Sequence, residues 1–342
     1  MPLVETQQEQ DTMTEATPIK PHDRLAAACA PEMEAVNDLI RARMASEHAP
    51  RIPEVTAHLV DAGGKRVRPL LTIACAKMCG AVGDNPIKLA ATVEFIHTAT
   101  LLHDDVVDES HQRRGRPTAN LLWDNQSSVL VGDYLFARSF QLMVETGSLR
   151  MLDILSGAAA TIAEGEVLQL TAARNLATTE ATYLQVVRGK TAALFQAAAE
   201  VGGVAADAPE EHIRALATYG DALGISFQIV DDWLDYGGAG DDIGKNLGDD
   251  FREGKLTLPV IRAIARGDDD EQAFWKQALE QGQADDLDRA RAILARHGTL
   301  EETRLEALAW RDKARTALAT LPPSELRDML EDLADYVVAR AH

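Results

Sequence analysis

The sequence predicts an all-α protein built as a single large helical bundle. Three observations support this fold class. Prolines and capping residues mark helix boundaries along the chain, apolar residues recur with helical spacing, and neither strand alternation nor an Asn-Gly hairpin signal is present. With 342 residues, of which 46% are hydrophobic, the chain can bury the core that such a bundle requires.

The N-terminal stretch MPLVETQQEQDTMTEATPIK is polar and has neither the basic segment nor the apolar segment of a signal peptide. We interpret residues 1–20 as a mobile polar tail and residues 21–342 as one all-helical domain. No apolar run reaches the length needed to span a bilayer, so we expect a cytoplasmic protein.

The first helices are predicted from residues that typically begin or end a helix. The stretch GGKRVRP interrupts the chain, and Pro69 then suits the first turn of a helix that Gly80 closes. Asn85 as N-cap and Pro86 at the first helical position begin a long helix that carries HDDVVD near its end. A loop, HQRRGRPT, is expected to follow.

The remaining helices are predicted in the same way. Thr299 and Glu302 have the spacing of a capping box, and Ser324 offers another N-cap. Further helices are expected at about 128–146, 149–174, 179–201, 209–236 and 256–266, with several more before the C-terminus.

Charge and cysteine content exclude several functions. The formal net charge of -20 would repel a phosphate backbone, so no nucleic-acid partner is expected. Cys29, Cys75 and Cys79 form no disulfide framework, and no His or Cys lies near enough in sequence to suggest zinc. We therefore expect buried free thiols.

Two aspartate clusters carry the functional signal. The stretch LLHDDVVDES contains Asp104, Asp105 and Asp108, and FQIVDDWLDY repeats the same Asp-Asp-x-x-Asp spacing with Asp231, Asp232 and Asp235. Residues at i, i+3 and i+4 share a helix face, so each cluster would project together, the second with Gln228 one turn earlier. Burying such carboxylates among leucine and valine is costly unless a cation compensates them.

Hard oxygen ligands without His or Cys suit Mg²⁺, which takes one or two carboxylates together with waters and substrate phosphates. Two facing helices with such clusters could hold a diphosphate through bridging metal ions. The alternative is that each cluster is an ordinary solvated helix face. A calcium loop fits less well, because the glycine and terminal glutamate of an EF-hand are missing.

Basic residues lie beside both clusters in an otherwise acidic chain. Their side chains bind phosphate oxygens by charge-assisted hydrogen bonds, although each group taken alone could be a surface feature. The groups are Lys65, Arg66 and Arg68; Arg113 and Arg114; Arg188, Lys190 and Thr191; and Lys245 and Lys255.

These motifs resemble those of the trans-isoprenyl diphosphate synthases. GGKRVRP, HDDVVDESHQRRGRPT, GKT, FQIVDDWLDY and GKNLGDDFREGKLTLP come in the family's order over about residues 64 to 259. More narrowly, the chain is similar to the long-chain polyprenyl synthases of bacterial ubiquinone biosynthesis, in the octaprenyl to decaprenyl range. The resemblance implies an isoprenoid synthase bundle with a central cavity, and a homodimer.

The resemblance also implies roles for individual residues. The ligands of about three Mg²⁺ ions would be Asp104, Asp105, Asp108, Asp231, Asp232 and Asp235. Contacts to the allylic diphosphate would come from Arg113, Lys190, Thr191, Gln228, Lys245 and Lys255. Isopentenyl diphosphate would be bound by Lys65, Arg68, His97 and Arg114. Glu166 and Gln169 in GEVLQL also fit the family, without a role that the motif assigns.

The implied reaction joins isopentenyl diphosphate head-to-tail to an allylic diphosphate such as farnesyl diphosphate. Mg²⁺ and basic side chains would stabilise the departing diphosphate, and the allylic cation would be attacked by the double bond of isopentenyl diphosphate. Small residues at Ala99 and Thr100, one turn before Asp104, would leave a tunnel open for a long product. Such a product would allow at most loose membrane association.

Two other interpretations of the sequence stay open. A class I terpene cyclase uses a similar metal–diphosphate trigger but typically lacks the basic set at Lys65, Arg68 and Arg114. A non-catalytic partner subunit of a heteromeric synthase usually has degraded aspartate motifs, whereas both are complete here. The exact product length and the preferred allylic primer are not determined by the sequence.

Overall fold

The computed structural model describes residues 19–61, 64–113, 115–237 and 247–340. The first half of the chain contains α1 Pro21–Ala28, α2 Ala30–Met44, α3 Arg51–Asp61, α4 Val67–Met78, α5 Asn85–Val107, β1 Gln112–Arg113, β2 Arg116–Pro117, α6 Ala119–Leu122, α7 Asn125–Glu145 and α8 Leu149–Ala172. The second half contains α9 Glu180–Val187, the π-helix η1 Arg188–Ala192, α10 Ala193–Ala205, α11 Glu210–Gly237, α12 Asp249–Glu253, α13 Leu258–Arg266, α14 Asp269–Trp275, the π-helix η2 Lys276–Glu280, α15 Leu287–Arg296, α16 Thr299–Leu318 and α17 Glu325–Ala339.

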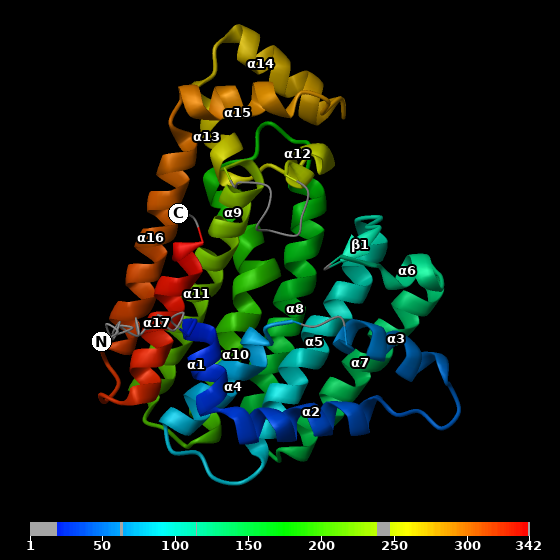
Figure 1. The fold of residues 1–342 in the computed structure, drawn as a ribbon, viewed down its shortest axis with the longest axis vertical. Helices are drawn as coiled ribbons and strands as arrows, with labels where there is room; N and C mark the ends of the chain where they lie inside the picture. The colour runs from blue at the N-terminus through cyan, green and yellow to red at the C-terminus, as the bar shows by residue number, and fades with distance from the viewer. Residues whose placement is uncertain (1–18, 62–63, 114, 238–246, 341–342) are drawn as a thin grey trace, which may run out of the picture.

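Long helices form the body of the molecule. In Figure 1, α5, α8, α10 and α11 run along its long axis, α2 crosses the lower end, and α14 with α15 cross the upper end. The predicted all-α bundle of the isoprenoid synthase type is confirmed. Helix α5 is buried along most of its length, from Leu89 to Leu102, because it packs against α2, α4, α7 and α10. Its C-terminal end carries the aspartates, of which Asp105 is buried whereas Asp104 and Asp108 are partly exposed.

The first and last helices of the described chain meet. Helix α1 packs against α17, and Arg24 pairs with Asp332 at 2.8 Å across that contact. The polar tail expected at residues 1–20 lies outside the described residues except for Ile19 and Lys20, which precede α1. No helix in the described ranges is both long and apolar enough to cross a membrane.

Most helix boundaries lie within a few residues of the predicted ones, but the helix expected at about 179–201 is divided into α9, η1 and α10 and ends at Ala205. Pro69 lies in the first turn of α4 and Ser324 caps α17, as expected. Asn85 is already helical and Asp84 holds the N-cap position, which moves the predicted cap by one residue. The predicted capping box at Thr299 is wrong, because α16 begins at Thr299 and Gly298, with a φ of 66°, precedes it.

The expected loop at HQRRGRPT contains a short hairpin instead. Strands β1 and β2 pair antiparallel, with Gln112 opposite Pro117 and Arg113 opposite Arg116. Gly115 provides the positive φ of 73° that the tight turn requires. The hairpin sets the direction of Arg113 directly after the first aspartate cluster.

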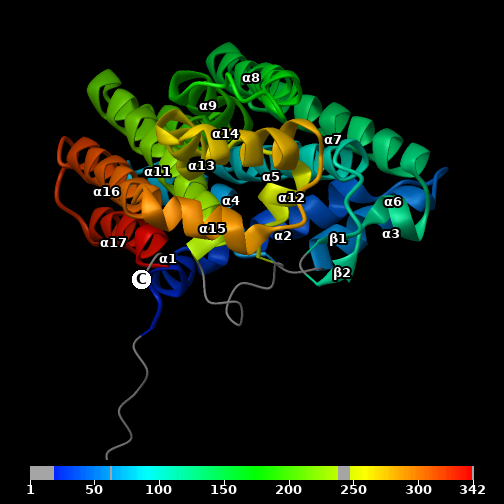
Figure 2. The same ribbon diagram turned by 90° about the horizontal axis from the view of Figure 1, so that it is seen from above.

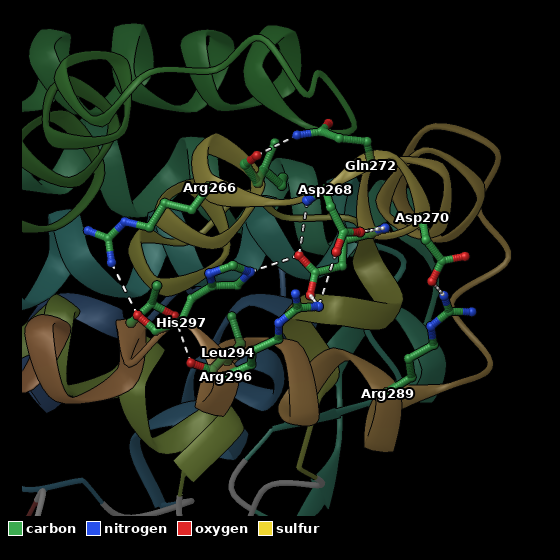
Figure 3. Close-up of polar contacts among 11 residues, drawn as sticks. Arg266, Asp268, Asp270, Gln272, Arg289, Leu294, Arg296 and His297 are labelled. Atoms are coloured by element: carbon green, nitrogen blue, oxygen red, sulfur yellow. Dashed lines mark hydrogen bonds and ion pairs between the residues drawn. The ribbon is translucent and has the colours of Figure 1, made fainter.

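Helices α14 and α15 at the upper end are joined by a polar network (Figure 3). Asp268 and Glu271 form a capping box at the start of α14. The buried Glu271 carboxylate accepts hydrogen bonds from Arg296 at 2.9 Å and lies 2.7 Å from His297 Nε2. Arg266 pairs with Glu302, which ties α13 to α16. These contacts fix the positions of helices α13, α14, α15 and α16 relative to one another.

This upper region supports α12 beside the aspartate clusters. Phe251 of α12 is fully buried and its ring lies 6.3 Å from those of both Phe274 and Trp275. Gly248, with a φ of 78°, is the N-cap of α12 and lies so close to Leu287 that a Cβ on Gly248 would approach the Leu287 side chain to 2.6 Å. Aromatic packing from α14 thus fixes the position of α12.

Candidate active site

The first aspartate cluster ends α5, and Asp104 lies beside a lysine from another helix. Lys190 Nζ of η1 is 3.9 Å from Asp104 Oδ2 and 2.9 Å from Glu166 Oε2 of α8. Asp108 is the C-cap residue of α5 and is half-buried. The end of α5 and the helix η1 therefore bring three predicted site residues close together: Asp104, Asp108 and Lys190.

The side chain of Asp105 is hydrogen-bonded to the hairpin. Its side chain is fully buried, and its Oδ1 accepts hydrogen bonds from Arg113 Nε at 2.9 Å and Nη2 at 2.7 Å. Both residues were predicted to act on the metal–diphosphate group, Asp105 as a ligand and Arg113 as a phosphate contact. In this arrangement the Asp105 carboxylate holds Arg113, and the predicted metal and phosphate contacts of the two residues stay predictions.

The second cluster contains a buried chain of hydrogen bonds. Asp232 is 3% exposed and accepts from Tyr183 at 2.6 Å and from Gln228 at 2.9 Å. Gln228 in turn accepts from Thr191 at 2.8 Å. The predicted residues Thr191, Gln228 and Asp232 are thus joined, and Tyr183 is a member that sequence reasoning missed.

Asp235 secures α12. Its two carboxylate oxygens accept from the backbone N–H groups of Asp249 at 3.1 Å and Asp250 at 3.2 Å. This places Asp250, which the sequence motifs did not single out, 3.7 Å from the predicted phosphate contact Lys255. Asp250 and Lys255 line a pocket of about 110 Å³ together with Lys190, Thr191, Gln228 and Asp232.

A separate cavity of about 420 Å³ is lined by cationic residues. Lys65, Arg68 and His97, predicted as the isopentenyl diphosphate contacts, all line it. Arg68 Nη1 lies 3.3 Å from His97 Nε2, and its guanidinium stacks over Phe195 with 4.4 Å to the ring centroid. A guanidinium stacked in this way can bind an anion through its edge.

Three further residues of this cavity come from the ends of the chain. His22 of α1 lies 2.6 Å from the carbonyl oxygen of Lys65, Tyr336 of α17 lies under the Lys65 ammonium, and Arg340 follows α17. Arg340 stacks over Phe227 and pairs with Asp231 at 3.0 Å. The cationic cavity therefore adjoins the second aspartate cluster through Arg340.

The remaining predicted residues divide into two groups. Ala99 is fully buried and Thr100 half-buried on α5, one turn before Asp104. Arg114 and Lys245 lie outside the described residues, so their predicted phosphate contacts stay predictions.

Burial dominates the electrostatics of the carboxylates. It raises the pKa of Asp104 to about 7, which Lys190 opposes and Glu166 increases. It raises the pKa of Asp232 to about 8, and nearby Asp250 adds to that shift. It also raises the pKa of Asp235 to about 7, with Asp250 again adding to it. Carboxylates with this environment gain strongly from a cation.

These shifts predict that the metal-free protein loses stability as pH rises. A carboxyl group with a pKa near 3.8 unfolded and about 7 or 8 folded binds more protons in the folded chain between those values. Stability should therefore fall from about pH 4 to about pH 8 and level off above it. Thermal unfolding midpoints recorded without divalent ions would show it.

The matched comparison is the Asp104→Asn variant, which lacks one titrating group. Its midpoint should fall less steeply over the same pH range than that of the unaltered chain. Parallel curves for the two proteins would contradict the role assigned to Asp104.

The donor set fits a divalent cation at some of the aspartates. Asp104, Asp108 and Asp231 present carboxylate oxygens that are partly accessible, the ligand type that Mg²⁺ prefers. Four of the six aspartates already accept hydrogen bonds and would have to exchange those partners to reach a metal: Asp105, Asp231, Asp232 and Asp235. Within the described ranges no three acidic, His or Cys side chains converge into a ready-made metal site.

A helical bundle with two acidic clusters beside a cation-lined cavity defines the class of prenyltransferases that act on diphosphates. The comparisons with known proteins agree. The family model described as "Polyprenyl synthetase" matches residues 49–295, so the chain belongs to this family. It is a prenyltransferase of the octaprenyl-to-decaprenyl diphosphate synthase type, which makes long-chain trans-polyprenyl diphosphates.

Three relatives support that statement. Octaprenyl diphosphate synthase of Escherichia coli is 42% identical over 319 residues, which cover 93% of this chain and 98% of the relative. The structure of a decaprenyl diphosphate synthase from Rhodobacter capsulatus matches with a TM-score of 0.92 and 69% identity, covering 94% of this chain and all of that one. A polyprenyl synthase from Caulobacter crescentus, solved with calcium and isoprenyl diphosphate, matches with a TM-score of 0.88 and 50% identity over 95% and 100% of the chains.

Proposed function

We propose that this enzyme extends an allylic diphosphate, with farnesyl diphosphate as primer, by repeated addition of isopentenyl diphosphate. The product would be an all-trans chain of octaprenyl to decaprenyl length that serves as the ubiquinone side chain. The observation that carries the proposal is the cavity of Lys65, Arg68 and His97 next to the aspartate clusters. One diphosphate would be held through metal ions, and the other by cationic side chains directly.

Mg²⁺, when bound by Asp104, Asp108 and Asp231 in about three ions per site, would neutralise the allylic diphosphate and favour its departure. Lys190 lies near enough to Asp104 to reach the same phosphate oxygens, and Thr191 and Gln228 are fixed beside it. Lys255 approaches from the α12 side. Its burial lowers its pKa, but Asp250 and Glu253 reverse this and raise it, so the ammonium stays charged.

On the other side, Lys65, Arg68 and His97 would hold isopentenyl diphosphate with its double bond toward the allylic carbon. Departure of the allylic diphosphate breaks the C1–O bond and leaves an allylic cation. The double bond of isopentenyl diphosphate donates its electrons to C1, and the resulting tertiary cation loses a proton to the released diphosphate. The bound substrates would have to exclude water, which would otherwise capture the cation.

The test is to incubate the purified protein with farnesyl diphosphate, labelled isopentenyl diphosphate and Mg²⁺ and to resolve the products by chain length. An ordered series ending near eight to ten isoprene units is the expected result. Consumption of the primer without incorporation of label would indicate a cyclase. No turnover with any primer would indicate a partner subunit.

We also propose that the enzyme is a homodimer. Helices α7 and α8 pack together and expose large apolar side chains on outward faces, and they form one edge of the molecule in Figure 2. These exposed residues are Val129, Leu130, Phe140, Val144, Leu149, Val167 and Leu170. An apolar face of this kind is typical of a surface that another chain covers.

The dimer proposal predicts that Leu130→Arg yields monomers. A buried charge without a partner opposes association strongly, and light scattering coupled to gel filtration would show a halved mass. The matched control is Leu305→Arg on α16, which is also exposed, at 51%, but lies on neither α7 nor α8. A dimer that survives Leu130→Arg would place the interface elsewhere.

A further inference from the structure

The motif GEVLQL has no assigned role, and its glycine lies against the glycine of RGKT. A Cβ added to Gly165 of α8 would meet the backbone nitrogen of Lys190 at 2.7 Å and Gly189 Cα at 2.8 Å. A Cβ added to Gly189 would meet Gly165 Cα at 2.7 Å. The two helix backbones are therefore in direct contact, which explains glycine at two positions where alanine would favour a helix.

The contact brings together the residues that follow the two glycines. Glu166 and Lys190 form an ion pair at 2.9 Å, and each side chain is 24% exposed. The π-helix η1 lies at this point of the chain and lets Thr191 reach Gln228 of α11 while Lys190 reaches α8 and α5. The direction of Lys190 thus depends on the closeness of α8 and η1.

The two carboxylates near Lys190 are not equivalent. Glu166 is within hydrogen-bonding distance of its ammonium, whereas Asp104 at 3.9 Å is not. Glu166 therefore draws the ammonium away from Asp104, whose oxygens would otherwise be occupied by it. The second oxygen of Glu166, Oε1, is buried without a hydrogen-bond partner in the described structure, so the contact of Glu166 with Lys190 runs through Oε2.

We infer that Glu166 is a positioning residue for Lys190: it holds the ammonium off Asp104, keeping Asp104 available to a metal ion, and near the diphosphate that the ion carries. This inference rests on the proposed function, in which Asp104 binds Mg²⁺ and Lys190 contacts the allylic diphosphate. Lys190 would compete with the cation for Asp104 when an uncharged residue replaces Glu166.

The first test measures binding rather than turnover. Glu166→Gln keeps the shape of the side chain and removes its charge. Equilibrium binding of an unreactive farnesyl thiolodiphosphate is titrated with Mg²⁺, and the concentration for half-maximal binding should rise about tenfold in the variant. The KM for isopentenyl diphosphate should not change, because Lys65, Arg68 and His97 are untouched. Glu164→Gln, an exposed position on the same helix, is the control for the loss of one charge.

A second experiment, in a variant that lacks Lys190, distinguishes a positioning role of Glu166 from direct metal binding by Glu166. In Lys190→Met protein, adding Glu166→Gln should leave the Mg²⁺ requirement unchanged, because no ammonium remains to compete for Asp104. A tenfold shift that persists without Lys190 would mean that Glu166 binds the metal itself and would overturn the inference.

The glycine contact supplies an independent variant. Gly165→Ala should push η1 away and raise the Mg²⁺ requirement as Glu166→Gln does. Gly157→Ala on the same helix is its control, since a Cβ there meets nothing within 4 Å. If Gly165→Ala does not fold, the result with Glu166→Gln still tests the inference.

Failure of the inference and failure of the proposed function give different results. If the unaltered chain does not bind the analogue in a Mg²⁺-dependent way, the proposed function fails. If it does and Glu166→Gln needs no more Mg²⁺ than Glu164→Gln, the inference alone is wrong.

Discussion

Asp104→Asn is expected to lower kcat by about 10³-fold while raising the thermal stability of the metal-free protein. The carboxylate is buried enough to raise its pKa to about 7, so above that pH its charge destabilises the fold. Asparagine keeps the shape and removes that charge. It also removes a ligand of the proposed metal ion, which supplies much of the stabilisation of the departing diphosphate. Steady-state kinetics would test the expected fall in kcat, and unfolding midpoints at about pH 8 would test the expected rise in stability.

Asp105→Asn, one residue later, should raise the stability of the metal-free protein less than Asp104→Asn does. Burial raises the pKa of Asp105 as well, but the hydrogen bonds from Arg113 Nε at 2.9 Å and Nη2 at 2.7 Å oppose that shift. Removing the charge therefore relieves the cost of burial and at the same time leaves the Arg113 guanidinium without a compensating carboxylate. Equal stabilisation by the two substitutions, measured as unfolding midpoints at about pH 8, would contradict the separate roles of these adjacent residues.

The difference between these neighbours shows what the sequence could and could not predict. Helical spacing placed Asp104 and Asp108 on one face of α5, and Pro86 marked the start of that helix correctly. The same spacing treats Asp105 as a third ligand. Its pairing with Arg113 depends on a hairpin that turns at Gly115, and periodicity does not report how a loop folds back.

The second cluster shows the same limit. The sequence selected Asp232 and Asp235 by their repeated spacing, but their hydrogen-bond partners come from other elements. Tyr183 lies on α9, and the N–H groups that Asp235 accepts from belong to α12. These pairings arise when α9, α11 and α12 pack together, and no local pattern in the chain signals them.

The cationic cavity is formed in part by residues from both ends of the described chain. Lys65, Arg68 and His97 were found from motifs, whereas His22, Tyr336 and Arg340 were not. Tyr336 and Arg340 are four residues apart, the spacing of one helix face, which is a signal that could have singled them out. Their convergence on one cavity follows from the packing of α1 against α17, which only the three-dimensional structure contains.

Thr100→Phe is expected to shorten the product from the octaprenyl–decaprenyl range to about farnesyl or geranylgeranyl length. Thr100 lies one turn before Asp104 on α5 and is half-buried, so part of its side chain is not covered by packed neighbours. A phenyl ring there would block a growing chain without altering the aspartates. Chromatography of products made from geranyl diphosphate and labelled isopentenyl diphosphate would give the new length. Thr100→Val, which is close to threonine in size and shape, should leave it unchanged.

Ala99→Phe is expected to shorten the product as well, but at a different cost. Ala99 is 0% exposed, so the added ring must displace packed neighbours, and overpacking of this kind typically costs about 1–3 kcal/mol. The unfolding midpoint should therefore fall in Ala99→Phe and change little in Thr100→Phe. If both variants fold and still release long products, the floor of the tunnel does not lie at these two residues. If only Thr100→Phe shortens the chain, the tunnel passes the Thr100 side of α5, and Ala99 contributes packing alone.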